Sequence, residues 1–172
     1  MPEEMFDVVD EQDRVLRQAP RSEVHARRWL HRASHIFVFN SAGQLLVHRR
    51  SATKDECPLL HTSSASGHLA AGEGYEEAAV RELAEELGLH SPVHFLAVIP
   101  ANGAETSFEH SGLFYSITDE TPQFDPVEIE SGEFLGLDEI QRRIESRPGD
   151  FTPCFRTLFR WYLGHAARAT PQ

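Results

Sequence analysis

The chain of 172 residues has few cysteines, no long apolar run and few positive charges. Its two cysteines, Cys57 and Cys154, are too few for a disulfide framework and lack metal-site spacing, so we expect reduced thiols in a cytoplasmic protein. The first residues, MPEEMFDVVDEQD, lack the basic and apolar segments of a signal peptide. No apolar stretch approaches the roughly 18 residues that a membrane helix needs, so no membrane partner is expected.

Positive charge is in the minority, with 16 Lys and Arg against 27 Asp and Glu, and the formal net charge is −11. A surface of this sign repels nucleic-acid backbones, so no stable nucleic-acid complex is expected. A small anionic substrate such as a nucleotide can still bind where cations supply the countercharge. The hydrophobic content of 40% fits a single soluble domain over residues 1–172.

The most informative stretch runs from Gly67 to Leu89 and reads GHLAAGEGYEEAAVRELAEELGL. Residues 75–87 contain neither Pro nor Gly and are rich in Ala and Glu, which predicts a helix. Gly88 is the residue type that ends a helix in the left-handed conformation. The stretch therefore reads as a loop, a helix and a second loop.

Three glutamates of this helix, Glu82, Glu85 and Glu86, fall within one arc at about 100° per residue, beside an apolar stripe that faces the core. Like charges at this spacing repel one another. Clustered carboxylates suit a hard divalent cation such as Mg²⁺. A solvated, Glu-rich helix face is the simpler alternative.

The same stretch fills every fixed position of the pattern G-x5-E-x7-R-E-U-x-E-E-x-G-U, in which U is aliphatic. The chain therefore resembles the Nudix hydrolases, with residues 67–89 as the Nudix box. The resemblance implies an α/β fold, an α/β/α sandwich on a mixed β-sheet, and the order of predicted elements also fits it. Residues of about 1–33 would form an N-terminal extension.

The resemblance also implies a reaction: Mg²⁺-dependent or Mn²⁺-dependent attack of water on phosphorus, in a nucleoside di- or triphosphate or a nucleoside diphosphate linked to a group X. In this family the first box glutamate pairs with the arginine, which makes Glu73 and Arg81 structural partners here. The three helix glutamates become metal ligands, two of them, Glu85 and Glu86, with a catalytic role. A backbone carbonyl at Ser66 or Gly67 would complete the coordination.

Family members often take a general base from outside the box helix, and the second half of the chain offers three acidic candidates. Glu128 lies in the predicted acidic loop 124–133, ahead of an aromatic strand residue in EIESGEF. Glu109 precedes the predicted strand 112–117, and Glu130 is the third. An exposed glutamate without a role is the plain alternative for each.

Basic residues gather in HRRSATKDE, which contains Arg49, Arg50 and Lys54. They end a predicted strand and enter a predicted loop over residues 51–66, which leads to the box. We expect these three side chains to bind the diphosphate of the substrate. Solvated strand-end charges are the alternative.

A narrower resemblance covers the first 90 residues, which are similar to the isopentenyl-diphosphate isomerases in VVDEQDRVL, HRRSATKDECP and SSASGHLAAGE. The isomerases have a catalytic cysteine just before Gly-His, where this chain has Ser66, a far weaker acid. Cys57 lies well upstream and is not an evident substitute. His25, His31 and His68 are similar to isomerase metal ligands, or else are ordinary polar residues.

Two alternatives to the hydrolase follow from these resemblances. One is an isomerase-like enzyme, and the other is a Nudix module that binds a nucleotide without cleaving it. A silent module is expected to lose box glutamates, and none is lost here. The sequence leaves the substrate and the oligomeric state open.

Overall fold

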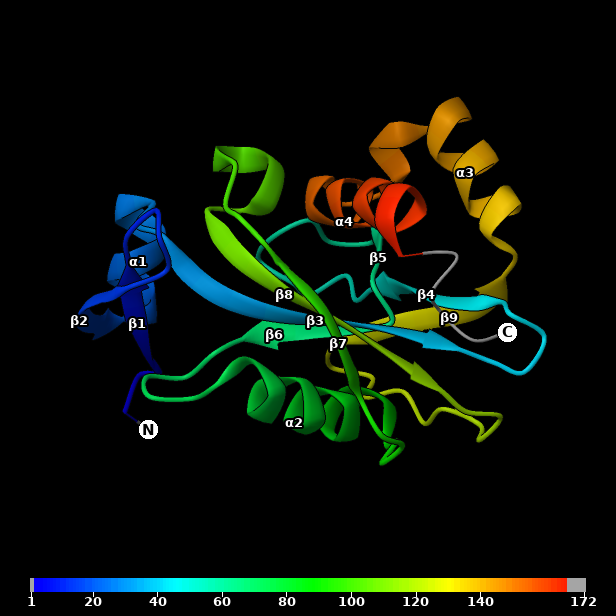
Figure 1. Ribbon diagram of the computed structural model, residues 1–172, viewed down its shortest axis with the longest axis horizontal. Helices are drawn as coiled ribbons and strands as arrows, with labels where there is room; N and C mark the ends of the chain where they lie inside the picture. Colours follow the sequence, from blue (N-terminus) through cyan, green and yellow to red (C-terminus); the bar gives the residue numbers. More distant parts are fainter. Residues whose placement is uncertain (1, 167–172) are drawn as a thin grey trace.

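The computed structural model describes residues 2–166 and has a mixed β-sheet between two helical layers (Figure 1). The strand order is β5-β4-β3-β8-β7, with β6 also pairing with β3 and β9 with β4. Strands β3 and β8 run parallel, and the other pairs of this sheet are antiparallel. The strands are β3 (His31–Phe39), β4 (Leu45–Arg50), β5 (His61–Thr62), β6 (Ala65–His68), β7 (His94–Ile99), β8 (Glu109–Ile117) and β9 (Ile129–Leu135).

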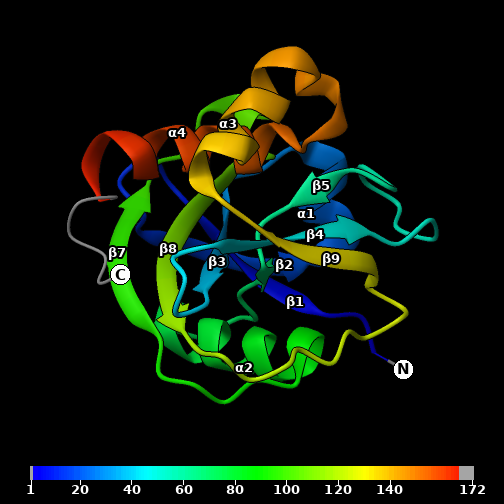
Figure 2. The same cartoon turned by 90° about the vertical axis from the view of Figure 1, so that its right-hand side faces the viewer.

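Helix α2 (Tyr75–Leu87) is the predicted box helix and covers one face of the sheet (Figure 2). It ends at Gly88, whose φ of 63° is left-handed, and the Gly88 N–H donates to the carbonyl of Ala84 at 2.9 Å. The prediction for residues 75–87 is therefore confirmed. The apolar stripe of α2 packs on alternate strand residues in a cluster that includes Ile36, Val38, Leu46, Phe114, Ala79, Leu83 and Leu87.

The opposite face of the sheet is covered by α3 (Leu137–Ser146) and α4 (Pro153–His165), with short 3-10 helices at Gly103–Thr106 and Pro148–Asp150. Phe37 points to this face because side chains alternate along a strand, and its ring packs on Phe155 and Tyr162 of α4. The side chain of Thr152 accepts the N–H of Phe155 at 3.1 Å and so caps the start of α4. Within residues 2–166, no helix combines the length and apolar character that crossing a membrane requires.

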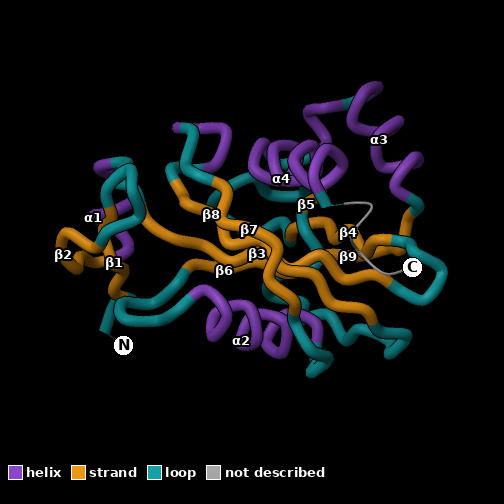
Figure 3. The backbone as a smooth tube through the Cα atoms, viewed as in Figure 1, coloured by secondary structure: helices purple, strands orange, loops and turns teal. Residues whose placement is uncertain are grey.

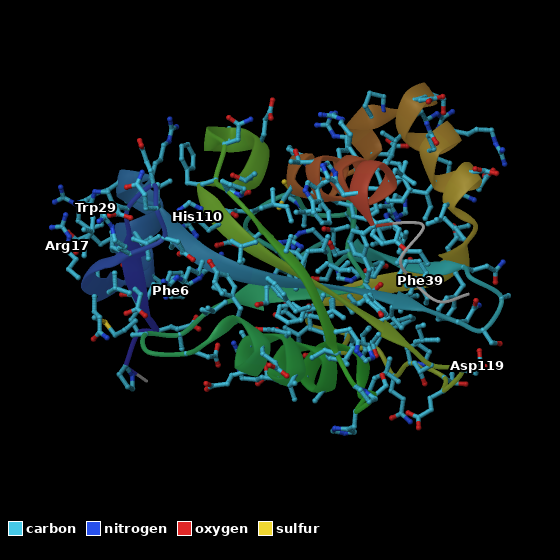
Figure 4. All side chains as sticks on the ribbon, in the orientation of Figure 1. Phe6, Arg17, Trp29, Phe39, His110 and Asp119 are labelled. Atoms are coloured by element: carbon cyan, nitrogen blue, oxygen red, sulfur yellow. The ribbon has the colours of Figure 1, made fainter. Side chains whose placement is uncertain are left out.

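A small hairpin of β1 (Met5–Val9) and β2 (Val15–Pro20), followed by α1 (Arg21–Arg27), lies beside one end of the sheet (Figure 1). Figure 4 labels Arg17 and Trp29 at its outer end, where the guanidinium lies 4.4 Å from the indole ring centroid. His110, also labelled, donates from Nε2 to the carbonyl of Asp10 at 2.9 Å. This hydrogen bond joins the hairpin to β8.

Two segments predicted as loops contain strand residues (Figure 3). Segment 51–66 includes β5 and the start of β6, and segment 124–133 includes much of β9. Both predictions were wrong at these positions because β5 and β6 are very short and the early part of β9 is polar, so neither carries a clear apolar alternation. As a result, Ser66 and Gly67 lie on a strand paired with β3, which gives them a fixed position beside α2.

Candidate active site

A cleft of about 540 Å³ lies among β3, β6, α2, the start of α4 and the segments around residues 54 and 128. Arg81 also lines the cleft, whereas its partner Glu73 does not. Most of the site residues predicted from the sequence line this cleft: Arg50, Lys54, Ser66, Gly67, Glu82, Glu85, Glu86, Glu109 and Glu128.

Glu86 is the most deeply buried of the three helix glutamates, with 5% of its surface exposed. The backbone N–H of Ser66 donates to Glu86 Oε1 at 2.7 Å, which fixes the carboxylate against β6. Burial and the neighbouring charge of Glu82 raise the pKa of Glu86 well above its ordinary value. A carboxylate in this position binds a proton or a cation readily.

Glu82 lies against the backbone of Gly67, so closely that a Cβ at Gly67 would overlap its carboxylate. Arg81 Nη1 donates to Glu82 Oε1 at 2.6 Å. Burial raises the pKa of Glu82 to about 7, although Arg81 acts in the opposite direction. A side chain at position 67 would therefore displace the carboxylate of Glu82 from its place against β6.

Arg81 holds the box together through a two-pronged ion pair with Glu73. Its Nε and Nη2 donate to the two oxygens of Glu73 at 2.9 and 2.8 Å, and Nη2 also donates to the carbonyl of His68 at 3.1 Å. Nη1 reaches Glu85 Oε2 at 3.2 Å. The Glu73–Arg81 pair expected from the resemblance is thus present, and it joins the loop before α2 to the helix.

The donor set on this side of the cleft fits a hard divalent cation. Glu82, Glu85 and Glu86 offer carboxylate oxygens, and Arg81 is the cation that contacts two of them. Mg²⁺ and Mn²⁺ prefer oxygen ligands of this kind. The backbone of Ser66 and Gly67 lies against the same carboxylates, so main-chain oxygen could join the set.

The raised pKa values predict how stability depends on pH and on metal. Because the folded pKa values of Glu82 and Glu86 exceed the ordinary value of 4.5, the folded protein binds protons that the unfolded chain releases. In EDTA, their contribution to the free energy of unfolding should therefore fall as pH rises from about 5 to about 8. Excess Mg²⁺ at about pH 8 should raise the melting temperature, because a bound cation replaces the protons.

The Glu82→Gln variant is the control for this measurement, because contributions from the histidines cancel when the two pH profiles are subtracted. The difference then reports Glu82 together with the effect of its charge on Glu86. The variant should show a shallower fall in melting temperature than the unmodified protein over the same pH range. Identical profiles would show that Glu82 has an ordinary pKa in the folded protein.

The basic residues Arg50 and Lys54 line the same cleft as these glutamates. Lys54 Nζ donates to Glu128 Oε2 at 2.6 Å, and Glu128 lies near enough to raise the pKa values of Glu82 and Glu86. The loop that carries Lys54 is fixed because Ser51 Oγ donates to the carbonyl of Val127 at 2.7 Å. The structure therefore brings the leading candidate for the general base, Glu128, together with a lysine and the helix carboxylates.

Two charged residues that the sequence analysis named as candidates, Arg49 and Glu130, lie outside the cleft, and one that it did not name, Arg21, lines it. Arg49 points to the opposite side of β4, where Nε donates to the carbonyl of Leu59 at 3.0 Å and the side chain lines a second depression. Glu130 is exposed and lies outside the cleft. Arg21 lines the cleft, 3.7 Å from Asp55, although nothing in the local sequence distinguished it.

Glu109 belongs to a cluster with three histidines. Its Oε1 lies 2.8 Å from His68 Nε2 and 3.5 Å from His31 Nε2. Burial alone would raise the pKa of Glu109, but His68 and His31 lower it well below its ordinary range. One nitrogen from each of His25, His31 and His68 lies within 4.8 Å of the others. The fold therefore gathers at one place the three histidines that the sequence analysis read either as metal ligands or as ordinary polar residues.

The histidine cluster has the donor chemistry of a metal site. His31 donates from Nδ1 to the carbonyl of Trp29 at 2.9 Å, which turns its Nε2 toward Glu109 Oε1 at 3.5 Å. Among residues 2–166 this Nε2 is one of two buried side-chain polar atoms without a hydrogen-bond partner. A backbone carbonyl that orients a histidine in this way is typical of metal ligands. Three imidazoles and a carboxylate would suit Mn²⁺, Zn²⁺ or a related ion.

Comparison with known proteins shows which family this chain belongs to. Residues 29–155 match the NUDIX domain. An isopentenyl-diphosphate Delta-isomerase of Pectobacterium atrosepticum is 33% identical over 88% of this chain and 87% of its own. A prenyl-diphosphate phosphatase of Methanosarcina mazei is 30% identical over 88% of this chain and 91% of its own.

A solved structure shows the same fold. DR0079 from Deinococcus radiodurans has a TM-score of 0.73 and 31% sequence identity, with coverage of 83% of this chain and 90% of its own. The expected α/β sandwich on a mixed sheet is therefore confirmed. The prediction of a Nudix-type pyrophosphohydrolase is confirmed at the level of the family, and the chain belongs to the Nudix family.

Proposed function

We propose that this protein is a Mg²⁺-dependent hydrolase, able to use Mn²⁺, that cleaves a phosphoanhydride bond in a small nucleotide. The observation that carries the proposal is the convergence in one cleft of Glu82, Glu85 and Glu86 with Lys54 and Glu128. The carboxylates would hold the cation, and Arg50 and Lys54 would bind the phosphates. The substrate would be a nucleoside di- or triphosphate or a nucleoside diphosphate linked to a group X.

Each residue has a distinct task in this proposal. When bound, the metal acidifies the attacking water and neutralises charge on the phosphoryl oxygens. Arg50 and Lys54 attract the anionic substrate, and Arg81 keeps the box rigid through Glu73. Glu128 would accept the proton of the attacking water at a carboxylate oxygen, a step that contributes roughly 10² to 10⁴-fold.

The lining of the cleft favours a polar substrate over a prenyl chain. Among the described residues that line it, Ala33 is the one aliphatic side chain, and most of the others are charged or polar. An isopentenyl group would have to desolvate those charged groups without compensation. Ribose hydroxyls and phosphates could instead pair with them.

A second candidate, chemistry on a prenyl diphosphate, is favoured by the cluster of His25, His31, His68 and Glu109 and by the names of the two relatives. Isomerisation needs a protein acid that protonates carbon. Ser66 stands where the resemblance places a cysteine, and a hydroxyl is a much poorer acid. This supports hydrolysis rather than isomerisation as the reaction.

The test is a substrate panel with the purified protein in Mg²⁺ and, in parallel, in EDTA. The panel contains nucleoside di- and triphosphates, nucleotide sugars, dinucleoside polyphosphates, coenzyme A and isopentenyl diphosphate, and products are separated by chromatography. Turnover of one nucleotide class in Mg²⁺, with none in EDTA, is the expected result and identifies X.

The other outcomes each reject part of the proposal. Release of phosphate from isopentenyl diphosphate alone would retain the hydrolase and reject the nucleotide. Conversion of isopentenyl diphosphate to its allylic isomer would make this an isomerase. Binding of a nucleotide without cleavage of any compound would leave a silent module as the function.

A further inference from the structure

A third group of side chains with the chemistry of metal ligands lies at the floor of the same cleft. His35 on β3, Glu109 on β8 and Cys154 in the first turn of α4 all line the cleft. Their exposed fractions are 5%, 7% and 7%. They offer one nitrogen, one oxygen and one sulfur, and the three donor atoms lie within 4.8 Å of one another.

The distance between two of these atoms matches a metal site. Cys154 Sγ lies 3.6 Å from His35 Nε2. Zn–S and Zn–N bonds of about 2.3 Å and about 2.05 Å, held at a tetrahedral angle, place sulfur and nitrogen about 3.6 Å apart. The separation of these two donor atoms therefore matches that of two ligands of one Zn²⁺ ion. A weak hydrogen bond between thiol and imidazole has a similar length, so an experiment must separate the two.

The supporting contacts hold each donor in place. His35 Nδ1 is hydrogen-bonded to Ser63 Oγ at 2.9 Å, which turns Nε2 toward Cys154. The cap that Thr152 provides fixes the first turn of α4. Glu109 uses Oε1 for its contacts with His68 and His31, so its carboxylate also has a second oxygen to offer. Outer contacts of this kind orient metal ligands.

Charge balance also favours a cation at this position. A thiolate, a carboxylate and a neutral imidazole together carry two negative charges, which one divalent cation neutralises. A neutral assembly is much less costly to bury than an isolated charge. Sulfur and nitrogen ligands select thiophilic ions, unlike the all-carboxylate set on α2.

We propose that His35, Glu109 and Cys154 bind a thiophilic divalent cation such as Zn²⁺ at the floor of the cleft. Binding releases the thiol proton of Cys154 to solvent, forms a metal–sulfur bond and involves no oxidation or reduction. Since the three residues line the cleft, the ion keeps an open coordination position toward solvent. The site goes beyond the hydrolase proposal and does not depend on it.

The test is titration of the reduced full-length protein with Co²⁺, followed by absorbance. A thiolate bound to Co²⁺ gives a sulfur-to-metal charge-transfer band in the near ultraviolet, which carboxylates and imidazoles do not give. The band should appear, reach a maximum intensity that corresponds to one thiolate–Co²⁺ site per chain, and disappear when Zn²⁺ is added. Cys57→Ser should retain it, because that thiol lines the same cleft but is not part of the group.

The Cys154→Ser and Cys154→Ala variants should lose the band while they keep the circular dichroism spectrum of the unmodified protein. If both unfold, His35→Gln serves instead, and it should weaken Co²⁺ binding and change the band. A band that persists in the Cys154 variants and vanishes in Cys57→Ser would assign the thiolate to Cys57 and overturn the proposal. Absence of any band in the unmodified protein would leave only a hydrogen bond between Cys154 and His35.

Discussion

Replacement of Glu86 by glutamine should reduce turnover of the nucleotide substrate by about 10²-fold or more. The amide has nearly the same shape, and its oxygen can still accept the hydrogen bond from the Ser66 N–H at 2.7 Å. What it removes is the negative charge that binds the cation. The free energy of unfolding in EDTA should not fall, because the amide resembles the protonated carboxyl that burial already favours.

Glu76→Gln is the matched control, because Glu76 lies on the same helix but is exposed and outside the cleft. It should leave turnover within about twofold of the unmodified protein. The measurements are kcat and KM in saturating Mg²⁺ with thermal unfolding in EDTA. Full activity in Glu86→Gln would show that the helix carboxylates are not the metal site.

Replacement of Glu128 by glutamine should lower kcat by about 10²-fold with little change in KM, if this carboxylate accepts a proton from the attacking water. The variant keeps a hydrogen-bond acceptor for Lys54 Nζ, which now lies 2.6 Å from Glu128 Oε2. The loss should therefore come from proton transfer rather than from a displaced lysine.

Glu130→Gln is a close control for this variant, because Glu130 lies two residues further along the same chain segment and is exposed outside the cleft. Its kcat should be unchanged. Glu109→Gln tests the competing carboxylate. Near-normal kcat in Glu128→Gln together with a collapse in Glu109→Gln would assign the proton acceptor to Glu109.

The helix and its carboxylates could be predicted from the sequence because their geometry is local. Spacing along one helix places Glu82, Glu85 and Glu86 on one face, and the structure preserves it in α2. The contact between Glu73 and Arg81 also spans only a short stretch of chain. No distant strand had to be placed to find these residues.

The other half of the cleft depends on contacts between distant segments. Glu109 meets His31 because β3 and β8 pair in parallel with these two residues in register. Nothing within either strand specifies that register, so the contact of Glu109 with His31 and His68 could not be derived from the sequence, although the resemblance to the isomerases had grouped the three histidines. The same holds for Cys154, which α4 brings to His35 from the far end of the chain.

Which of Arg49 and Arg50 faces the cleft also could not be predicted from the sequence. Neighbouring residues of a strand point to opposite faces, so the two could not both reach one cleft. Alternation predicts that one of them faces the cleft, but the choice depends on which side of β4 the box helix covers. The structure assigns Arg50 to the cleft and Arg49 to the other side.

The position of Lys54 in the cleft has a consequence for chemical labelling of this protein. Lys54 is the only lysine in the sequence. Fluorophores, crosslinkers and sensor surfaces that react with amines would therefore attach at the α-amino group of the chain or within the cleft, and at no other side chain. The same chemistry could serve as a reporter, since a molecule that fills the cleft would shield this one amine from the reagent.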